Sequence, residues 1–99
     1  MATLREAVIV DAVRTPMGRR NGKLKDWHPV DLMAQVLSFL AERNNLNKEL
    51  VDDVIVGCVT QITEQSANIG RNAVLAANFP ESVPGTTVDR QCGGPEPRY

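Results

Sequence analysis

The stretch Thr86-Thr87-Val88-Asp89-Arg90-Gln91-Cys92-Gly93-Gly94 decides how the rest of the chain is interpreted. Its β-branched start, Thr86 to Val88, predicts a strand, and Cys92 follows where that strand ends. Proteins of the α/β class place their chemistry at strand ends, because side chains there project into the crevice above the sheet. A cysteine in that position can act as a nucleophile when a following helix lowers its thiol pKa.

The last six residues, Gly94-Pro95-Glu96-Pro97-Arg98-Tyr99, do not predict such a helix. Two prolines flank a single residue, and proline is excluded from helix interiors. We therefore expect residues 1–93 to form a partial domain and residues 94–99 to be a tail of different character. Without a helix beyond it, the thiol of Cys92 is expected to titrate near the value of a free cysteine.

Length and composition indicate one ordinary globular domain. The 99 residues are 42% hydrophobic and 23% charged, with a net charge of −1, which argues against nucleic-acid binding or a membrane-surface role. No apolar run approaches the roughly 20 residues that span a bilayer, and the N-terminus lacks the layout of a secretory signal. The two cysteines form neither a disulfide framework nor a metal-binding pattern, so we expect no metal and a cytoplasmic location.

Three apolar runs are candidate strands: Ala7 to Val13, Val51 to Val59, and Thr86 to Val88. The first is nearly unbroken, which is typical of a strand buried on both faces of a parallel sheet. Asp11 interrupts that run. Its carboxylate has either a functional role or hydrogen-bond partners near the strand end.

Two segments between these runs predict helices. Pro29 to Asn44 carries an apolar stripe at i, i+3, i+4 spacing, with Asn44-Asn45 as a left-handed stop. Asn68 is a candidate N-cap for a second helix over Ile69 to Asn78, and residues 47–50 predict a short helical turn. The order is strand, helix, strand, helix, strand, and connections of this length predict parallel strands. Two helices cover only one face of such a sheet, so we expect an incomplete α/β unit.

Several other residues allow a functional and a structural interpretation. His28, the only histidine, is a candidate catalytic base or a cap at the entrance of the first helix, beside Trp27 as a packing anchor. Cys58 lies within an apolar run, which favours a structural role. Residues 14–25 hold five of the 11 basic residues. They form either a solvated loop or an anion site for a phosphate-bearing cofactor, although no glycine-rich phosphate motif is present.

Four segments in this order resemble the N-terminal half of the thiolase family: Asp11 to Gly18, Gly57 to Gln61, Glu64 to Arg71, and Arg90 to Gly93. The resemblance covers Ala7 to Gly93 and implies a βαβαβ, three-layer fragment of the thiolase fold, with parallel strands and incomplete. It also implies an acyltransferase that cleaves 3-ketoacyl-CoA by thiolysis or runs the reverse Claisen condensation. The family's acyl-accepting nucleophile falls on Cys92, and the implied substrates are coenzyme A thioesters, with no bound cofactor. The family further suggests a homo-oligomer.

The resemblance ends after Gly94. Family members continue there with small and polar residues that open a long helix. Later parts of the family supply the activating histidine, a second catalytic cysteine and most coenzyme A contacts. Neither His28 nor Cys58 lies in a matching motif, so neither inherits those roles. Acyl-chain length and reaction direction are not specified by the matching motifs.

Three hypotheses follow from this pattern. The first is a truncated thiolase segment that lacks turnover by itself. The second is a non-catalytic half-domain that completes its sheet against a partner chain. The third is a product that does not fold stably, because its open sheet face and edges promote aggregation.

Overall fold

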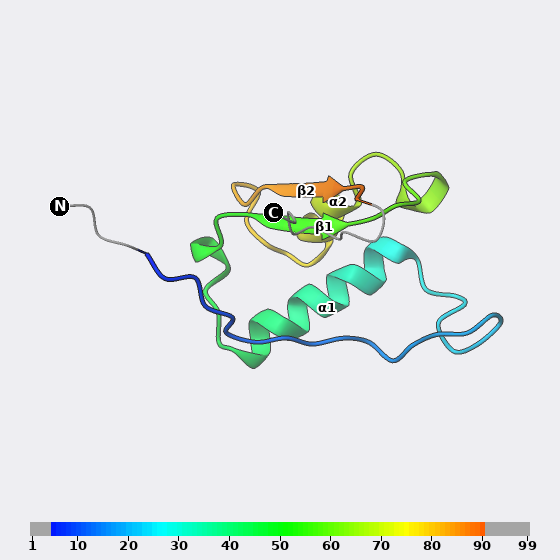
Figure 1. Cartoon of the computed structure of the whole chain (residues 1–99), viewed down its shortest axis with the longest axis horizontal. Helices are drawn as coiled ribbons and strands as arrows, with labels where there is room; N and C mark the ends of the chain where they lie inside the picture. The colour runs from blue at the N-terminus through cyan, green and yellow to red at the C-terminus, as the bar shows by residue number, and fades with distance from the viewer. Residues whose placement is uncertain (1–4, 91–99) are drawn as a thin grey trace.

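The computed structural model describes residues 5–90 and contains two helices and two strands (Figure 1). Helix α1 spans Pro29–Arg43, strand β1 spans Val54–Gly57, helix α2 spans Ile69–Ala76 and strand β2 spans Gly85–Val88. Two short 3₁₀ turns, Lys48–Leu50 and Thr63–Gln65, lie on either side of β1. The expected α/β class is confirmed.

The two strands pair in parallel, with Val54 opposite Gly85 and Gly57 opposite Val88. Parallel strands require a crossover connection, and α2 lies within it. The unit formed by β1, α2 and β2, residues 54–88, is called here the crossover unit. Its parallel pairing is the one that the sequence predicts.

Burial along β1 alternates, with Val54 and Val56 buried and Ile55 and Gly57 exposed. The buried side faces a core shared with both helices, in which Val74 and Val83 are fully enclosed. Ile55 is 50% exposed on the opposite side. Among the described residues, the helices therefore cover one face of the sheet, as the number of helices predicts.

Both helices begin and end at the residues whose chemistry favours those positions. The His28 ring nitrogen Nδ1 accepts a hydrogen bond from the Val30 N–H, and the Asn68 side chain accepts one from the Arg71 N–H. Asn45, just after α1, has φ 50°, the left-handed conformation that often ends helices. The capping interpretation of His28, the Asn68 cap and the asparagine stop are confirmed.

The strand expected over Ala7 to Val13 is not formed. Residues 5–27, called here the N-terminal arm, contain no helix or strand, and the sheet has two strands rather than three. Val8, Ile9 and Val10 are 73–89% exposed instead of buried. They run beside the C-terminal part of α1, near Leu40 and Leu46 (Figure 1), and make no sheet pairing there.

Asp11 attaches this arm to α1. One carboxylate oxygen accepts a hydrogen bond from the Asn44 side chain at 2.8 Å and lies 3.2 Å from Nε of Arg43, while the other accepts from the Ala12 N–H. These hydrogen bonds, first that of Asn44, hold the pKa of Asp11 below its usual value, with the Arg43 charge adding to them. The structural interpretation of Asp11 is the one that the contacts support.

Candidate functional site

The carboxyl ends of β1 and β2 lie side by side, and this edge is the candidate site. Gly57 is opposite Val88, and the Cys58 N–H donates to the Val88 carbonyl at 2.9 Å. Residues that follow the two strands therefore emerge at the same edge, where parallel sheets carry their ligand sites. Asp89 and Arg90 continue from β2 and are exposed. Cys92, the predicted nucleophile, lies outside the described residues.

Asn68 fixes β2, the strand that leads to this edge, against α2. Its amide nitrogen donates to the Gly85 carbonyl at 2.9 Å, and its oxygen accepts from the Thr87 hydroxyl at 2.7 Å. The same Thr87 oxygen accepts from the N–H of Gly70 at 2.9 Å. One side chain thus caps a helix and anchors a strand. The sequence predicted the cap, whereas the bonds to β2 carry no local sequence signal.

Two glycines allow α2 and β2 to approach this closely. A Cβ atom on Gly70 would lie 2.6 Å from the Thr86 carbonyl oxygen, and one on Gly85 would lie 2.8 Å from the backbone of Arg71. Real Cβ atoms do not approach backbone this closely, so both positions need glycine for packing rather than for an unusual backbone angle.

Arg71 holds the turn that leads into β2. Its guanidinium donates to the carbonyls of Val83 at 2.6 Å and Glu81 at 3.0 Å. These hydrogen bonds attach the turn before β2 to helix α2. The start of β2 is therefore fixed by Arg71 and Asn68 from the same helix, and the direction in which β2 runs is fixed with it.

Beside the edge lies a hollow of about 250 Å³ between α1, β1 and the start of α2. Its lining is mainly apolar and includes Met33, Val56 and Ile69. The side chains in its wall that can form hydrogen bonds are those of Thr15, Cys58 and Gln65. The Cys58 thiol donates to the Gln65 side-chain oxygen at 3.1 Å. The Gln61 side-chain nitrogen also donates to the Cys58 carbonyl at 3.1 Å. These contacts support the structural role predicted for Cys58.

The structure does not bring His28 into this site as a base, since its Nδ1 is used as a cap. Among residues 5–90, no three histidine, cysteine, aspartate or glutamate side chains gather as a metal-binding group. In the same range no helix is long and apolar enough to cross a membrane.

Residues 7–95 match the family model of the thiolase N-terminal domain. The chain is 52% identical over 92 residues to the steroid 3-ketoacyl-CoA thiolase FadA6 of Mycobacterium tuberculosis, covering 93% of this chain and 23% of that one. It is 47% identical to a 3-ketoacyl-CoA thiolase of Klebsiella pneumoniae, covering 91% of this chain and 24% of the relative.

Among solved structures, the acetyl-CoA acetyltransferase of Bacillus anthracis superposes with a TM-score of 0.70 at 43% sequence identity. The superposition covers 79% of this chain and 20% of that one. The chain therefore spans about a quarter or less of the length of these relatives. Matching over residues 7–95, together with the parallel strands and their crossover helix, shows that the chain belongs to the thiolase family and corresponds to part of its N-terminal domain.

Proposed function

We propose that this chain supplies the nucleophile segment of a thiolase-type acyltransferase, with Cys92 as the acyl-accepting residue. The observation that carries the proposal is positional. Cys92 is the fourth residue after β2, a strand whose direction is fixed by Asn68 and Arg71, within the family match. Two of the similar proteins are named as thiolases of 3-ketoacyl-CoA, so coenzyme A thioesters of that kind are the proposed substrates.

In the proposed reaction the thiolate of Cys92 attacks the 3-keto carbon of a 3-ketoacyl-CoA. The bond between C2 and C3 breaks, the electron pair passes to the acyl-CoA enolate, and that enolate takes a proton at C2. The acyl group left on the Cys92 sulfur then passes to the thiol of a second coenzyme A. Each step needs a group that ionises a thiol, stabilises an oxyanion or moves a proton.

We further propose that residues 1–93 do not turn over substrate by themselves. Loss of one oxyanion donor typically lowers a rate by about 10²–10³, and loss of an activating base lowers it by roughly 10²–10⁴ more. His28, the candidate base, is not available for that role because its Nδ1 is a helix cap. Residues 94–99 are proposed to be a tail outside this unit.

A chimera tests the assignment of Cys92. Residues 1–93 are joined to the remaining three quarters of the Klebsiella pneumoniae thiolase, and thiolysis of acetoacetyl-CoA is followed. We expect activity that Cys92→Ser abolishes and that the matched thiol control Cys58→Ser largely retains. Equal activity in the Cys92→Ser chimera would overturn the assignment. Cys92-dependent cleavage by the 99-residue chain alone would overturn the proposed lack of turnover.

The second candidate function is a half-domain that complements a separate partner chain. The open face of the sheet at Ile55 favours this alternative, because a partner could cover it. Co-expression with a thiolase segment that begins after the nucleophile, followed by affinity purification of one chain, tests it. Recovery of both chains together supports complementation, and recovery of one alone contradicts it.

We also propose a cytoplasmic location and, for the complete enzyme, a homo-oligomer. Two cysteines are too few for the disulfide framework of a small secreted domain, which supports the cytoplasmic location. The family resemblance supports the homo-oligomer.

A further inference from the structure

Asn68 and Thr87 join the start of α2 to β2. The Thr87 hydroxyl donates to the Asn68 side-chain oxygen at 2.7 Å and accepts from the Gly70 N–H at 2.9 Å. A hydroxyl has one hydrogen and two lone pairs, so these two bonds determine how it is oriented. Gly70 lies in the first turn of α2, where N–H groups lack partners within the helix. A side chain of β2 therefore caps the helix that packs on it.

Two contacts from Asn68 fix β2 along its length. Besides the bond with Thr87, the Asn68 side-chain nitrogen donates to the Gly85 carbonyl at 2.9 Å. Gly85 and Thr87 are two positions apart in the strand, so one planar amide holds the strand at both. A shift of β2 by one residue would turn the Thr87 side chain to the other face of the sheet and break its bonds. The position of β2 along its own direction therefore depends on Asn68.

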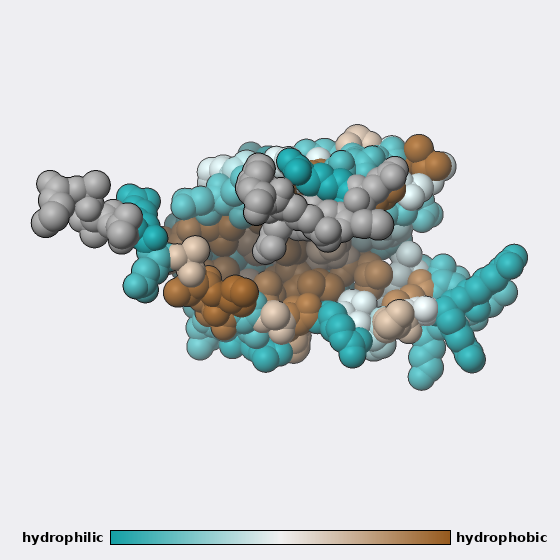
Figure 2. Space-filling model, in the orientation of Figure 1, coloured by the Kyte–Doolittle hydropathy of each residue, from teal (hydrophilic) through white to brown (hydrophobic). Residues whose placement is uncertain are grey.

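The other helix contacts the crossover unit in a different way. Apolar surface fills the band between the crossover unit and α1 in Figure 2. Val30, Met33 and Leu37 of α1 pack against the core. Apolar packing has no direction, so it favours burial without setting the register of a strand. The directional contacts that hold β2 at Gly85 and Thr87 come from α2 and its cap.

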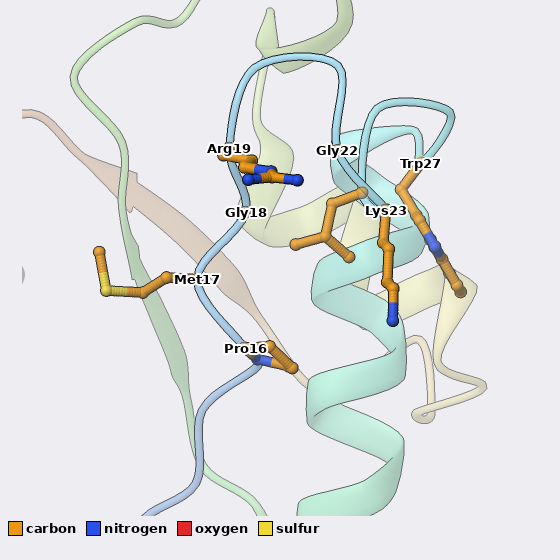
Figure 3. A pocket seen from close by; sticks show the side chains of 8 residues that line it. Pro16, Met17, Gly18, Arg19, Gly22, Lys23 and Trp27 are labelled. Atoms are coloured by element: carbon orange, nitrogen blue, oxygen red, sulfur yellow. The ribbon is translucent and has the colours of Figure 1, made fainter.

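Asn68 and Thr87 do not line the hollows on either side of α1's first residues. The larger hollow, shown in Figure 3, is lined by residues between positions 16 and 27. The hollow beside Cys58 is lined by Ile69 and by neither Asn68 nor Thr87. The polar atoms of both side chains are bonded within the protein. These bonds indicate a role in placing other residues and not in binding a ligand.

The residue before Asn68 has a strained backbone. Ala67 has a φ of 61°, in the left-handed region that alanine rarely adopts. Such conformations persist where the surrounding contacts determine them, and they are concentrated at active sites. The bonds of Asn68 to Gly85 and to the Arg71 N–H follow directly after Ala67 and can hold it in this conformation.

From these contacts we propose that Asn68 and Thr87 are positioning residues for the nucleophile of the acyl transfer. The inference rests on the proposed function, in which Cys92 accepts the acyl group. Cys92 is the fifth residue after Thr87, and the family resemblance assigns the activating histidine and most coenzyme A contacts to later parts of the family. The attacking sulfur and the substrate are therefore held by different parts of the enzyme. Asn68 and Thr87 act through β2, which carries the sulfur.

Displacement of β2 is expected to lower kcat and to leave KM nearly unchanged. An error of about 1 Å in the placement of reacting groups can lower a rate by about 10²-fold. The contacts with coenzyme A, which contribute to KM, belong to the other part and stay in place. A loss confined to kcat indicates an interaction that acts in the transition state and not in substrate binding.

The chimera of residues 1–93 with the remainder of the Klebsiella pneumoniae thiolase tests this role. Thr87→Val removes the hydroxyl with little change of shape, and Thr87→Ser keeps it. Thiolysis of acetoacetyl-CoA is measured, and kcat is corrected for the folded fraction from circular dichroism. We expect Thr87→Val to lower kcat at least about tenfold with KM changed less than about twofold. Thr87→Ser should stay within about twofold of the unaltered chimera.

Two asparagine caps give a matched pair of variants. Asn68→Ala is expected to lower kcat at least about tenfold. Asn47→Ala removes the same side chain from an exposed cap before β1, where its oxygen accepts from the Glu49 N–H at 3.1 Å, and should change kcat less than about twofold. An equal loss in both asparagine variants, or a Thr87→Val variant as active as Thr87→Ser, would overturn the positioning role. If Asn68→Ala does not fold, the two Thr87 variants decide.

A thiol assay separates this inference from the proposed function. Alkylation of Cys92 by iodoacetamide is followed across pH in the same chimera, and mass spectrometry identifies the modified peptide. A helix N-terminus lowers a thiol pKa only near its first turn, so a displaced sulfur should titrate closer to the free-cysteine pKa of about 8.5. We expect that shift in Thr87→Val and not in Thr87→Ser.

The two assays fail in different ways. In a chimera without turnover, the same alkylation profile in both Thr87 variants would overturn the positioning role, and the expected shift would support it. Turnover by a Cys92→Ser chimera would contradict the proposed acyl transfer through Cys92, whatever the alkylation profiles of the Thr87 variants.

Discussion

The same tripeptide, Val-Ile-Val, occurs twice in this chain with opposite outcomes. In the crossover unit Val54-Ile55-Val56 forms β1, with two of its three side chains buried, whereas Val8-Ile9-Val10 in the N-terminal arm is exposed and unpaired in the sheet. Among the described residues, β1 has β2 on one side and helices over one face, whereas Val8 to Val10 lie beside the end of α1. The comparison teaches that an apolar β-branched run becomes a strand only where a neighbour supplies hydrogen bonds and cover.

The comparison is most strongly tested at the glycines. Gly85→Ala should lower the free energy of unfolding by about 3 kcal/mol, because its new Cβ meets the Arg71 backbone at 2.8 Å, and backbone cannot move aside as a side chain can. Gly18→Ala in the arm meets the end of the Leu24 side chain at 3.2 Å and should cost less than about 1 kcal/mol. Urea unfolding followed by circular dichroism measures both. A Gly85→Ala variant as stable as Gly18→Ala would mean that α2 and β2 are not closely packed in solution.

The two valine runs give the next largest effect. Val56→Ala should lower the free energy of unfolding by about 2 kcal/mol through lost burial and a cavity, because Val56 is 6% exposed. Val10→Ala, at 81% exposed, should change it by no more than about 0.5 kcal/mol. The same urea titration compares them. A large loss from Val10→Ala would show that the arm is buried in solution.

The two helix caps extend the contrast. Asn68→Ala removes a cap together with bonds to Gly85 and Thr87, so we expect a loss of about 1.5 kcal/mol. His28→Ala removes one exposed cap bond and should cost about 0.5 kcal/mol. Thermal unfolding of both variants tests the order, and equal losses would contradict the idea that Asn68 anchors β2.

The attachment of the arm gives the smallest effect. Because its native hydrogen bonds lower the pKa of Asp11, the carboxylate stabilises the attachment above the pKa it has when detached, and this contribution is lost as pH falls through the lowered native value. Protection of residues 5–13 against hydrogen exchange, measured relative to the intrinsic exchange rate at each pH, should therefore fall on acidification, while protection in the crossover unit changes less.

Asp11→Asn is the control for that titration. Its arm should be less protected against exchange near neutral pH, and that protection should no longer depend on acid, since the amide carries no charge for Arg43. Acid dependence that persists in this variant would assign the effect to another group.

Sequence reasoning was most reliable where the deciding interaction is local. The Asn68 cap, the Asn45 stop and the proline start of α1 each depend on residues within one turn, and all three are formed. The strand predicted over Ala7 to Val13 was wrong, because an apolar pattern indicates a preference for burial and not the presence of a partner strand. Within the candidate site, the sequence predicted that the two parallel strands end at the same edge. The hydrogen bonds from Asn68 to β2 join residues 17 and 19 positions apart, and no local sequence pattern indicates them. Cys92 remains a prediction from the family resemblance.

The parallel register has a consequence for how the chain acquires its structure during synthesis. Val54 pairs with Gly85, so β1 is made roughly thirty residues before its partner and must wait for α2 and the following turn. We expect α1 to form early from local contacts, and the sheet to form late, in one cooperative step that closes when Arg71 and Asn68 bind the carbonyls around β2. A ribosome that pauses before Gly85 would hold β1 without its partner strand, which makes that interval the one in which a chaperone has most to protect.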